Sequence, residues 1–176
     1  MYKALVIFTA FVSFFNFGQE EREMMYHVYN EKTDECGYIN KDGDTLIPFG
    51  RFDYCFSDSM NYAIVLSLKA GEGFPAIDSK GNELFRVFAY DNGPDYIEDG
   101  MFRIVKNGLV GYATEEGKVI IPPTYEAAWP FKNGRALVSL KAEKVQLEEE
   151  HWTWVEEDPF YIDKNGNRHE NQSNEN

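Results

Sequence analysis

Apolar and polar residues alternate in short runs along this chain, and one run of six residues recurs four times. Each copy begins with an apolar or aromatic pair, continues with polar residues and ends in glycine. The copies lie at residues 38–43, 76–81, 112–117 and 161–166. Their glycines are 38, 36 and 49 residues apart. Repetition at this spacing is typical of stacked modules, because one such unit cannot bury its apolar face alone.

Each copy predicts a β-hairpin, in which glycine supplies the positive φ that a tight turn needs. A second apolar run follows each of the first three turns, and a third run completes each of these units. The second runs are 45–48, 83–85 and 118–122, and the third runs are 62–65, 102–105 and 135–138. Because proline cannot donate a backbone hydrogen bond, Pro48, Pro122 and Pro123 should end the second strand or place it at a sheet edge.

The units are also expected to pair with one another. Asn107 and Gly108 separate the second unit from the third, and Asn-Gly between β-prone runs is a strong hairpin signal. The pattern therefore predicts an all-β protein of stacked antiparallel β-hairpin repeats, an open β-repeat array with one continuous core. A small β-propeller is the alternative. Three strands per unit and unequal copy lengths favour the open array, because propeller blades have four strands.

These residues resemble the WG-repeat family, also called KWG repeats, in which Trp-Gly precedes a Tyr/Phe-Ile-Asp phrase and a glycine turn. The third copy resembles it most, with Gly111 and Tyr112 before the turn and Gly117 in it. The signature tryptophan is replaced in every copy, by Cys36, Phe74, Val110 and Pro159. The copies are thus degenerate, at about 36–65, 74–105, 109–138 and, in part, 159–168. The resemblance implies a bacterial, β-rich repeat fold and brings no shared catalytic residues.

The first residues have the layout of a secretory signal peptide. Lys3 precedes an apolar stretch at 4–15. The small residue Gly18 suits the last position before the cleavage site, whereas Asn16 is a poor residue for the third position before it. We expect a signal at 1–18 and a periplasmic or secreted protein, with an uncleaved anchor as the alternative. The stretch is shorter than the ~20 residues that span a bilayer, so no membrane insertion is expected after cleavage.

Three further regions follow the leader. Residues 19–35 form an acidic segment with a candidate capping strand, 36–168 form the repeat domain, and 169–176 form a polar tail that we expect to be disordered. The whole chain carries 30 acidic against 17 basic residues and a formal net charge of −13. Nucleic acid and anionic lipid surfaces attract Lys/Arg patches, so the sequence disfavours both as partners.

Cys36 and Cys55 are the only cysteines in the sequence. In an oxidising compartment such a pair is a disulfide candidate, and closing a loop of this size contributes ~3 kcal/mol. Two buried free thiols are the alternative. The two cysteines are too far apart in sequence for the Cys-x-x-Cys motif of redox enzymes.

Motifs for catalysis or metal binding are weak. A hydrolase triad would have to combine His27 or His151 with a serine such as Ser57, Ser67 or Ser139, and their spacing does not favour one. The segment 40–44 superficially resembles a calcium loop, but its glycine is at the fourth position and not the sixth, and turn formation explains its residues. The sequence therefore predicts no catalytic, cofactor-binding or metal-binding residues, and no enzyme.

The segment 139–159 departs most from the repeat, and we interpret it as an elongated, projecting hairpin. Trp152 and Trp154 would share one face of its second strand. They are either a cap over the core, which the usual burial of large aromatic residues favours, or anchors for a partner. We expect an exported, non-enzymatic binding or scaffold module that recognises a protein or glycan at the cell envelope. The alternative is a carbohydrate-active or peptidoglycan-associated enzyme that uses carboxylates.

Overall fold

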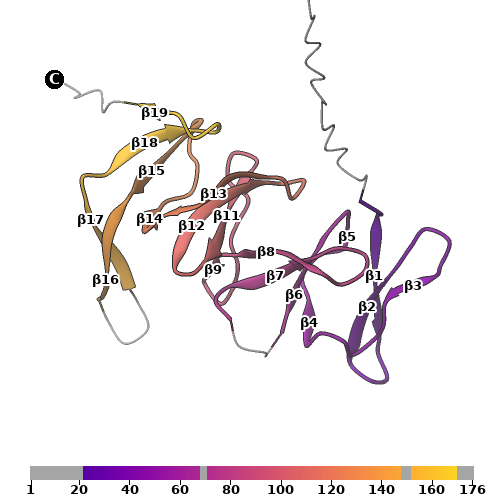
Figure 1. Ribbon diagram of the computed structural model, residues 1–176. Helices are drawn as coiled ribbons and strands as arrows, with labels where there is room; N and C mark the ends of the chain where they lie inside the picture. The colour runs from indigo at the N-terminus through magenta and orange to yellow at the C-terminus, as the bar shows by residue number, and fades with distance from the viewer. Residues whose placement is uncertain (1–21, 68–70, 148–151, 170–176) are drawn as a thin grey trace, which may run out of the picture.

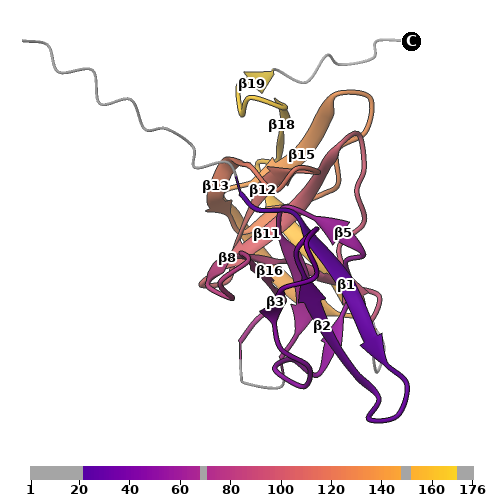
Figure 2. The ribbon, with the colours of Figure 1, turned by 90° about the vertical axis from the view of Figure 1, so that its right-hand side faces the viewer.

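The computed structural model describes residues 22–67, 71–147 and 152–169, and these residues contain strands and turns but no helix. No helix within these ranges could cross a membrane. The expected signal at 1–18 and the tail after His169 lie outside the described residues. The first and last strands lie at opposite ends of the molecule (Figure 1). Seen after a 90° turn, the strands of the first copy lie in front of the later copies (Figure 2).

The described strands are β1 (Met25–Asn30), β2 (Glu35–Ile39), β3 (Thr45–Ile47), β4 (Tyr54–Cys55), β5 (Ser59–Met60), β6 (Ala63–Leu66), β7 (Phe74–Ile77), β8 (Glu83–Val87), β9 (Ala89–Tyr90), β10 (Gly93–Pro94), β11 (Met101–Lys106), β12 (Leu109–Thr114), β13 (Val119–Tyr125), β14 (Ala127–Ala128), β15 (Arg135–Ser139), β16 (Lys141–Gln146), β17 (Trp152–Glu157), β18 (Phe160–Asp163) and β19 (Arg168–His169). Three sheets have the orders β3-β2-β1-β5, β13-β12-β11-β8-β7-β6-β4 and β14-β15-β18-β19. Two two-stranded ribbons, β9–β10 and β16–β17, complete the described fold.

Every pairing between these strands is antiparallel, and sheets run across the boundaries between copies. The third strand of each copy pairs with the first strand of the next, as β6 with β7, β11 with β12 and β15 with β18. At the β11–β12 boundary, Asn107 and Gly108 both have positive φ in a two-residue turn. The expected open β-repeat array is confirmed, and the unequal sheets with open edges are not the blades of a small propeller.

Prolines decide where these sheets end. In the first copy β3 stops at Ile47, immediately before Pro48, and it is an edge strand. In the third copy β13 contains Pro122 and Pro123 and is also an edge strand. The second copy has no proline at this point, and its β8 pairs with strands on both sides. The difference follows from the missing N–H of proline, which prevents a further strand from pairing on that side.

The four glycine turns share one hydrogen-bond pattern. In the first copy the Asn40 side-chain oxygen accepts bonds from the backbone N–H groups of Asp42 and Asp44, at 3.0 and 2.9 Å. Asp78 and Asp163 make the same pair of bonds in the second and fourth copies. Thr114 makes one of them in the third copy, through its hydroxyl. Turn formation therefore accounts for segment 40–44, as the sequence predicted.

Contacts between copies involve these same turns. The Arg51 guanidinium of the first copy donates to the Gly81 carbonyl in the second turn, at 3.2 Å. The hydroxyl of Tyr62 donates to the Glu115 carbonyl in the third turn, at 2.9 Å. Burial raises the pKa of Tyr62 to about 12, because the charged phenolate would be poorly solvated at this position. Stacking therefore depends on polar contacts to backbone carbonyls as well as on apolar burial.

The core consists of three clusters along the array, and the expectation of one continuous core is corrected. The first draws on β1 to β4, β6 and β7, and the second on β7, β8, β11 and β12. The third runs from Phe88 to Ile162 and also receives Trp154. Each cluster contains residues from at least two copies, so neighbouring copies do shield one another's apolar side chains from water. The seven-stranded sheet contributes to all three clusters, because successive residues of a strand point to opposite faces, as Ile104 and Val105 do.

The ends of the repeat region differ slightly from expectation. The candidate capping strand is β1, and it lies inside its sheet, between β2 and β5. It therefore extends the first sheet on the side away from β3. At the other end, β19 includes His169, so the ordered repeat continues one residue past the expected boundary at 168.

Candidate functional site

The segment between the third and fourth copies forms the hairpin β16–β17, as expected. Lys141 to Gln146 pair in register with Glu157 to Trp152. Its base is fixed by Ser139, whose hydroxyl lies 2.6 Å from the Glu157 carbonyl oxygen and 2.7 Å from the Lys141 carbonyl oxygen. Ser139 is fully buried. Its position is that of a structural residue, not of the nucleophile considered from sequence.

Trp152 and Trp154 point to the same side of β17 and meet one ring beneath them. The ring centroids of Trp152 and Trp154 are 5.0 Å apart. The Phe88 ring centroid lies 6.3 Å from that of Trp152 and 5.7 Å from that of Trp154. Trp154 also contacts Trp129, at 5.2 Å. It packs against the third core cluster, which is the cap role considered from sequence. Trp152 is different, because 37% of it remains exposed.

Phe88 lies between this pair and a buried ion pair. The Arg103 guanidinium lies 4.4 Å from the Phe88 ring centroid, a distance at which a cation attracts the ring face. Asp95 accepts three hydrogen bonds from Arg103, from Nη2 at 2.5 Å, Nε at 2.9 Å and the backbone N–H at 2.8 Å. Both side chains are almost completely buried. The paired geometry compensates their desolvation and fixes the cation beneath the aromatic ring.

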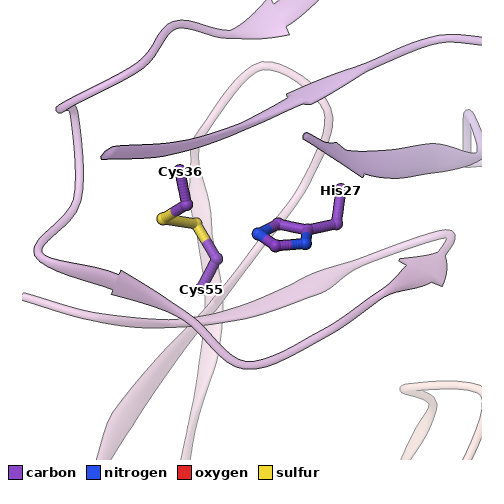
Figure 3. Close-up of side chains that lie close together, drawn as sticks. All are labelled: His27, Cys36 and Cys55. Atoms are coloured by element: carbon purple, nitrogen blue, oxygen red, sulfur yellow. A yellow bond between two sulfur atoms is a disulfide. The ribbon is translucent and has the colours of Figure 1, made fainter. Parts of the chain in front are cut away.

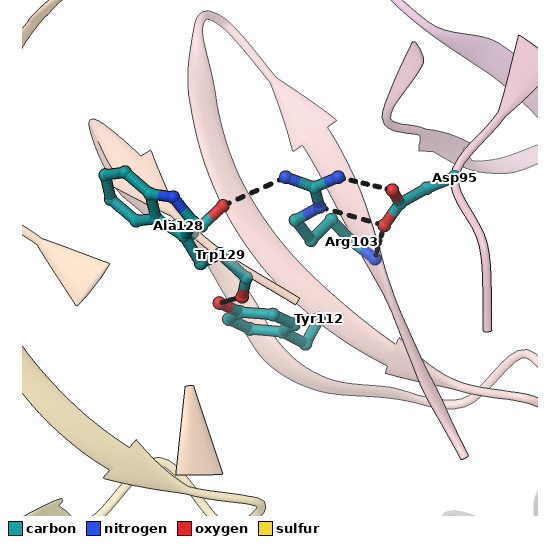
Figure 4. A network of polar contacts seen from close by, with 5 residues as sticks. All are labelled: Asp95, Arg103, Tyr112, Ala128 and Trp129. Carbon is teal, nitrogen blue, oxygen red and sulfur yellow. Dashed lines mark hydrogen bonds and ion pairs between the residues drawn. The ribbon is translucent and has the colours of Figure 1, made fainter. Parts of the chain in front are cut away.

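The same arginine helps to place Trp129 (Figure 4). Its Nη1 donates to the Ala128 carbonyl at 3.2 Å, and the Tyr112 hydroxyl donates to the Trp129 carbonyl at 2.6 Å. Burial raises the pKa of Tyr112, because the charged phenolate would be poorly solvated at this position. Two buried donors therefore hold the backbone at 128–129, and the Trp129 ring meets Trp154 from that backbone.

Two exposed tyrosines extend the aromatic group through Arg103. The guanidinium lies 5.5 Å from the Tyr90 ring, and Tyr90 lies 5.8 Å from Tyr96. These tyrosines are 50% and 58% exposed. We call Tyr90, Tyr96 and Trp152 the aromatic surface; Phe88 and Arg103 link them from below. Lys144 adds a cation to it, because its Nζ lies 3.6 Å from the Trp152 ring centroid.

Cys36 and Cys55 form a disulfide in the structure, far from the aromatic surface in sequence. Cys36 lies on β2 and Cys55 on β4, and both are buried in the first core cluster. His27, on β1, points its ring at this bond (Figure 3).

Ser57, another residue considered for a triad, makes hydrogen bonds within the fold. Its hydroxyl accepts one from the Ile64 N–H, and its carbonyl accepts one from the Tyr38 hydroxyl. His151 lies outside the described residues.

Sequence reasoning missed Phe88, Asp95, Arg103 and Trp129. One signal was present, because Arg103 interrupts an apolar run of residues 101–105 in a strand expected to be buried. A charge in such a position needs a buried partner. Its partner Asp95 could not be identified, because it lies on a connection whose path is set by the fold.

Comparison with known proteins agrees with the repeat pattern. Segments 37–66 and 111–142 match the family model described as WG containing repeat. They correspond to the first and third copies, so these two copies are similar to WG-type repeats. The second and fourth copies fall outside the matched segments but keep the same turn hydrogen bonds. No curated protein and no solved structure matches the chain.

Proposed function

We propose that this chain is an exported, non-enzymatic binding or scaffold module that recognises a protein or glycan partner at the cell envelope. The aromatic surface of Tyr90, Tyr96 and Trp152 is its contact region. The observation that carries the proposal is the contrast between two neighbouring tryptophans. Trp154 is used in packing, whereas Trp152 keeps more than a third of its surface exposed.

The surroundings of Trp152 suit a binding anchor. Phe88 and Trp154 contact its ring, and Lys144 covers part of it, so the side chain is already ordered before a partner arrives. An ordered aromatic side chain loses little conformational entropy on binding. Tryptophan and tyrosine are also the residue types that most often carry interface energy. Two exposed tyrosines, linked to Trp152 through Phe88 and Arg103, offer further rings on which sugar rings or apolar side chains can stack.

Export rests on the leader at 1–18, which has the layout of a signal peptide. A C-terminally tagged full-length chain, expressed in a bacterium and fractionated, tests this separately. We expect a tagged product shortened by the leader in the periplasm or medium. A product that stays in the cytoplasm at full length contradicts export without affecting the binding proposal.

Binding is tested with the mature protein and isolated envelope components. Peptidoglycan sacculi, neutral and acidic polysaccharides, and membrane-protein extracts are the probes, read by co-sedimentation and by tryptophan fluorescence. We expect saturable binding that Trp152→Ala weakens at least tenfold, about 1.4 kcal/mol. Val155→Ala is the matched control, because Val155 lies on the same strand and is 56% exposed. Equal binding by the Trp152 variant and the wild type would remove Trp152 from the contact region.

The carboxylate-enzyme alternative gains no support from the described carboxyl groups. A general acid needs a raised pKa near its operating pH. Asp78 and Asp163 instead have lowered pKa values, and side-chain and backbone hydrogen bonds of their turns lower them. These groups act as turn acceptors.

A further inference from the structure

His27, Cys36 and Cys55 form a compact group of metal-binding atom types outside the aromatic surface. Their potential ligand atoms, one imidazole nitrogen and two sulfurs, all lie within 4.8 Å of one another. Three different strands supply them, since His27 lies on β1, Cys36 on β2 and Cys55 on β4. Cys55 lies 28 positions after His27 in the sequence, so only the fold brings the three residues together.

Strand register places the first two side chains on one face. His27 pairs with Tyr38 and Tyr29 pairs with Cys36, so His27 and Cys36 are diagonal neighbours across β1–β2. Such neighbours on one sheet face are within reach of long side chains. Cys55 then approaches this face from β4, to which the present disulfide already ties Cys36. Backbone pairing therefore holds His27 near Cys36 without the sulfur–sulfur bond, and Cys55 is buried in the same core cluster as Cys36.

The imidazole offers an unused ligand atom. Figure 3 shows the His27 ring pointing at the disulfide, with the nitrogen farthest from its Cβ on the near side. That nitrogen, Nε2, is buried and has no hydrogen-bond partner. A buried polar atom without a partner is costly, and native structures usually give such atoms a role. Coordination to a metal ion would satisfy it.

We propose that the reduced form of this protein binds one zinc ion through Cys36 Sγ, Cys55 Sγ and His27 Nε2. Two thiolates and one imidazole are ligands that zinc prefers, and three protein ligands leave the fourth tetrahedral position for water or an outside ligand. The disulfide and the metal ion exclude each other, because the same two sulfurs serve both. The site is thus a redox-controlled metal site, closed in the oxidised protein.

The chemistry balances with a dithiol reductant. The dithiol gives two electrons to the Cys36–Cys55 bond, becomes a disulfide itself, and its two protons pass to the cysteine sulfurs. Zinc binding then releases these two protons to solvent, because the thiolate is the ligand. With zinc–sulfur bonds of ~2.3 Å, tetrahedral geometry needs the sulfurs about 3.8 Å apart. Rotation of the two cysteine side chains provides this separation, since both sulfurs already lie beside Nε2.

Cobalt titration of the mature protein provides the test. A phosphine reductant opens the disulfide and takes its oxygen from water, whose two protons go to the thiols; gel filtration in oxygen-free buffer then removes it. We expect the reduced protein to bind one Co²⁺ with thiolate-to-metal charge-transfer absorption, and Zn²⁺ to displace it. The oxidised protein should show no such absorption. Absence of the charge-transfer band in the reduced protein overturns the proposal.

His27→Gln separates a folded site from two loose cysteines. Loss of a direct ligand should weaken Co²⁺ affinity at least tenfold, given that even outer-shell changes at metal sites cost ~10–100-fold. His169→Gln is the matched control, because His169 lies on β19 at the other end of the array. The Co²⁺ affinity of this variant should equal that of the wild type. Equal affinity in the His27 variant overturns the three-residue site. A ¹H–¹⁵N spectrum of the reduced protein that shows unfolding overturns it as well.

Discussion

The indole rings of Trp154 and Trp129 lie edge to face with their centroids 5.2 Å apart. Trp154 belongs to the inserted hairpin, and Trp129 belongs to the third copy, where Arg103 and Tyr112 hold the adjacent backbone. This contact therefore fixes the hairpin relative to the repeat array. Trp152, two residues away, receives its position from the same anchoring, although it is itself exposed.

Trp154→Ala should destabilise the protein much more than Trp152→Ala. Removal of a largely buried tryptophan costs about 3–5 kcal/mol, and the partial exposure of Trp154 reduces this to about 2–4 kcal/mol. For Trp152→Ala we expect less than about 1.5 kcal/mol, because 37% of this residue is already exposed to water in the folded protein. Urea unfolding followed by far-ultraviolet circular dichroism measures both. Equal destabilisation by the two variants would mean that Trp152 is also a cap residue and not an anchor.

Gly111→Ala should destabilise the third copy through a backbone clash. A Cβ at this position would lie 2.3 Å from the Ile121 carbonyl oxygen and 2.6 Å from Pro123 N, neither of which can rotate away. Forced overpacking of this kind costs about 1–3 kcal/mol or more. Thermal unfolding of the oxidised protein measures the loss.

Gly93→Ala is the control for this change. A Cβ on Gly93 would meet its nearest atom, the Tyr90 carbonyl oxygen, at 3.9 Å, an ordinary contact. We expect a change in the free energy of unfolding within about 0.5 kcal/mol there. The first copy has the same close approach, because a Cβ on Gly37, the equivalent of Gly111, would lie 2.7 Å from the Ile47 carbonyl oxygen. A Gly111 variant as stable as the Gly93 variant would show that the close strand approach relaxes freely.

Removing either partner of the Arg103–Asp95 pair should strongly destabilise the protein, and the two losses should not add in the double variant. Asp95→Ala leaves a buried guanidinium without its carboxylate, and Arg103→Met leaves the carboxylate without its cation, each at about 3–5 kcal/mol. Since the second change removes a charge already stranded by the first, the double variant should be less destabilised than the sum by at least about 1 kcal/mol. Urea unfolding of the four proteins gives this coupling energy. Additive losses would contradict a mutual role of the pair.

The repeat architecture could be predicted because its signals are local. Asn107-Gly108 specifies a two-residue turn, and the side chains of Asn40, Asp78 and Asp163 close their own turns within four residues. Proline likewise acts on the strand that contains or precedes it. The division of the core into three clusters could not be predicted, because it depends on which strands meet across sheets after those turns are made.

The candidate site was predicted only in part. Trp152 and Trp154 could be found from strand spacing within one hairpin. The ring beneath them is Phe88, from another copy, and no short-range pattern connects residues more than sixty positions apart. His27 was considered only as a triad member, because its position beside Cys36 and Cys55 requires the register of β1 against β2 and the approach of β4.

The turn of the fourth copy should lose its structure at acid pH. Hydrogen bonds from Asn167 and Asn165, with a further contribution from His169, lower the pKa of Asp163 from 3.8 to about 2. A lowered pKa means that the folded turn favours the carboxylate, so this stabilisation is complete above about pH 4 and disappears as the pH falls through about 2. The amide resonances of Asn165 and Asn167, whose N–H groups donate to Asp163, should shift together in this range in ¹H–¹⁵N spectra.

Asp163→Asn is the control that isolates the carboxyl group. The first copy already uses Asn40 at the equivalent position, with the same two backbone bonds to its side-chain oxygen. The variant should therefore keep the turn, and its amides at 165 and 167 should no longer shift between pH 4 and 2. A wild-type Asn167 amide that stays constant down to pH 2, or an Asp163→Asn variant that titrates as the wild type does, would show that the Asp163 carboxylate does not hold this turn.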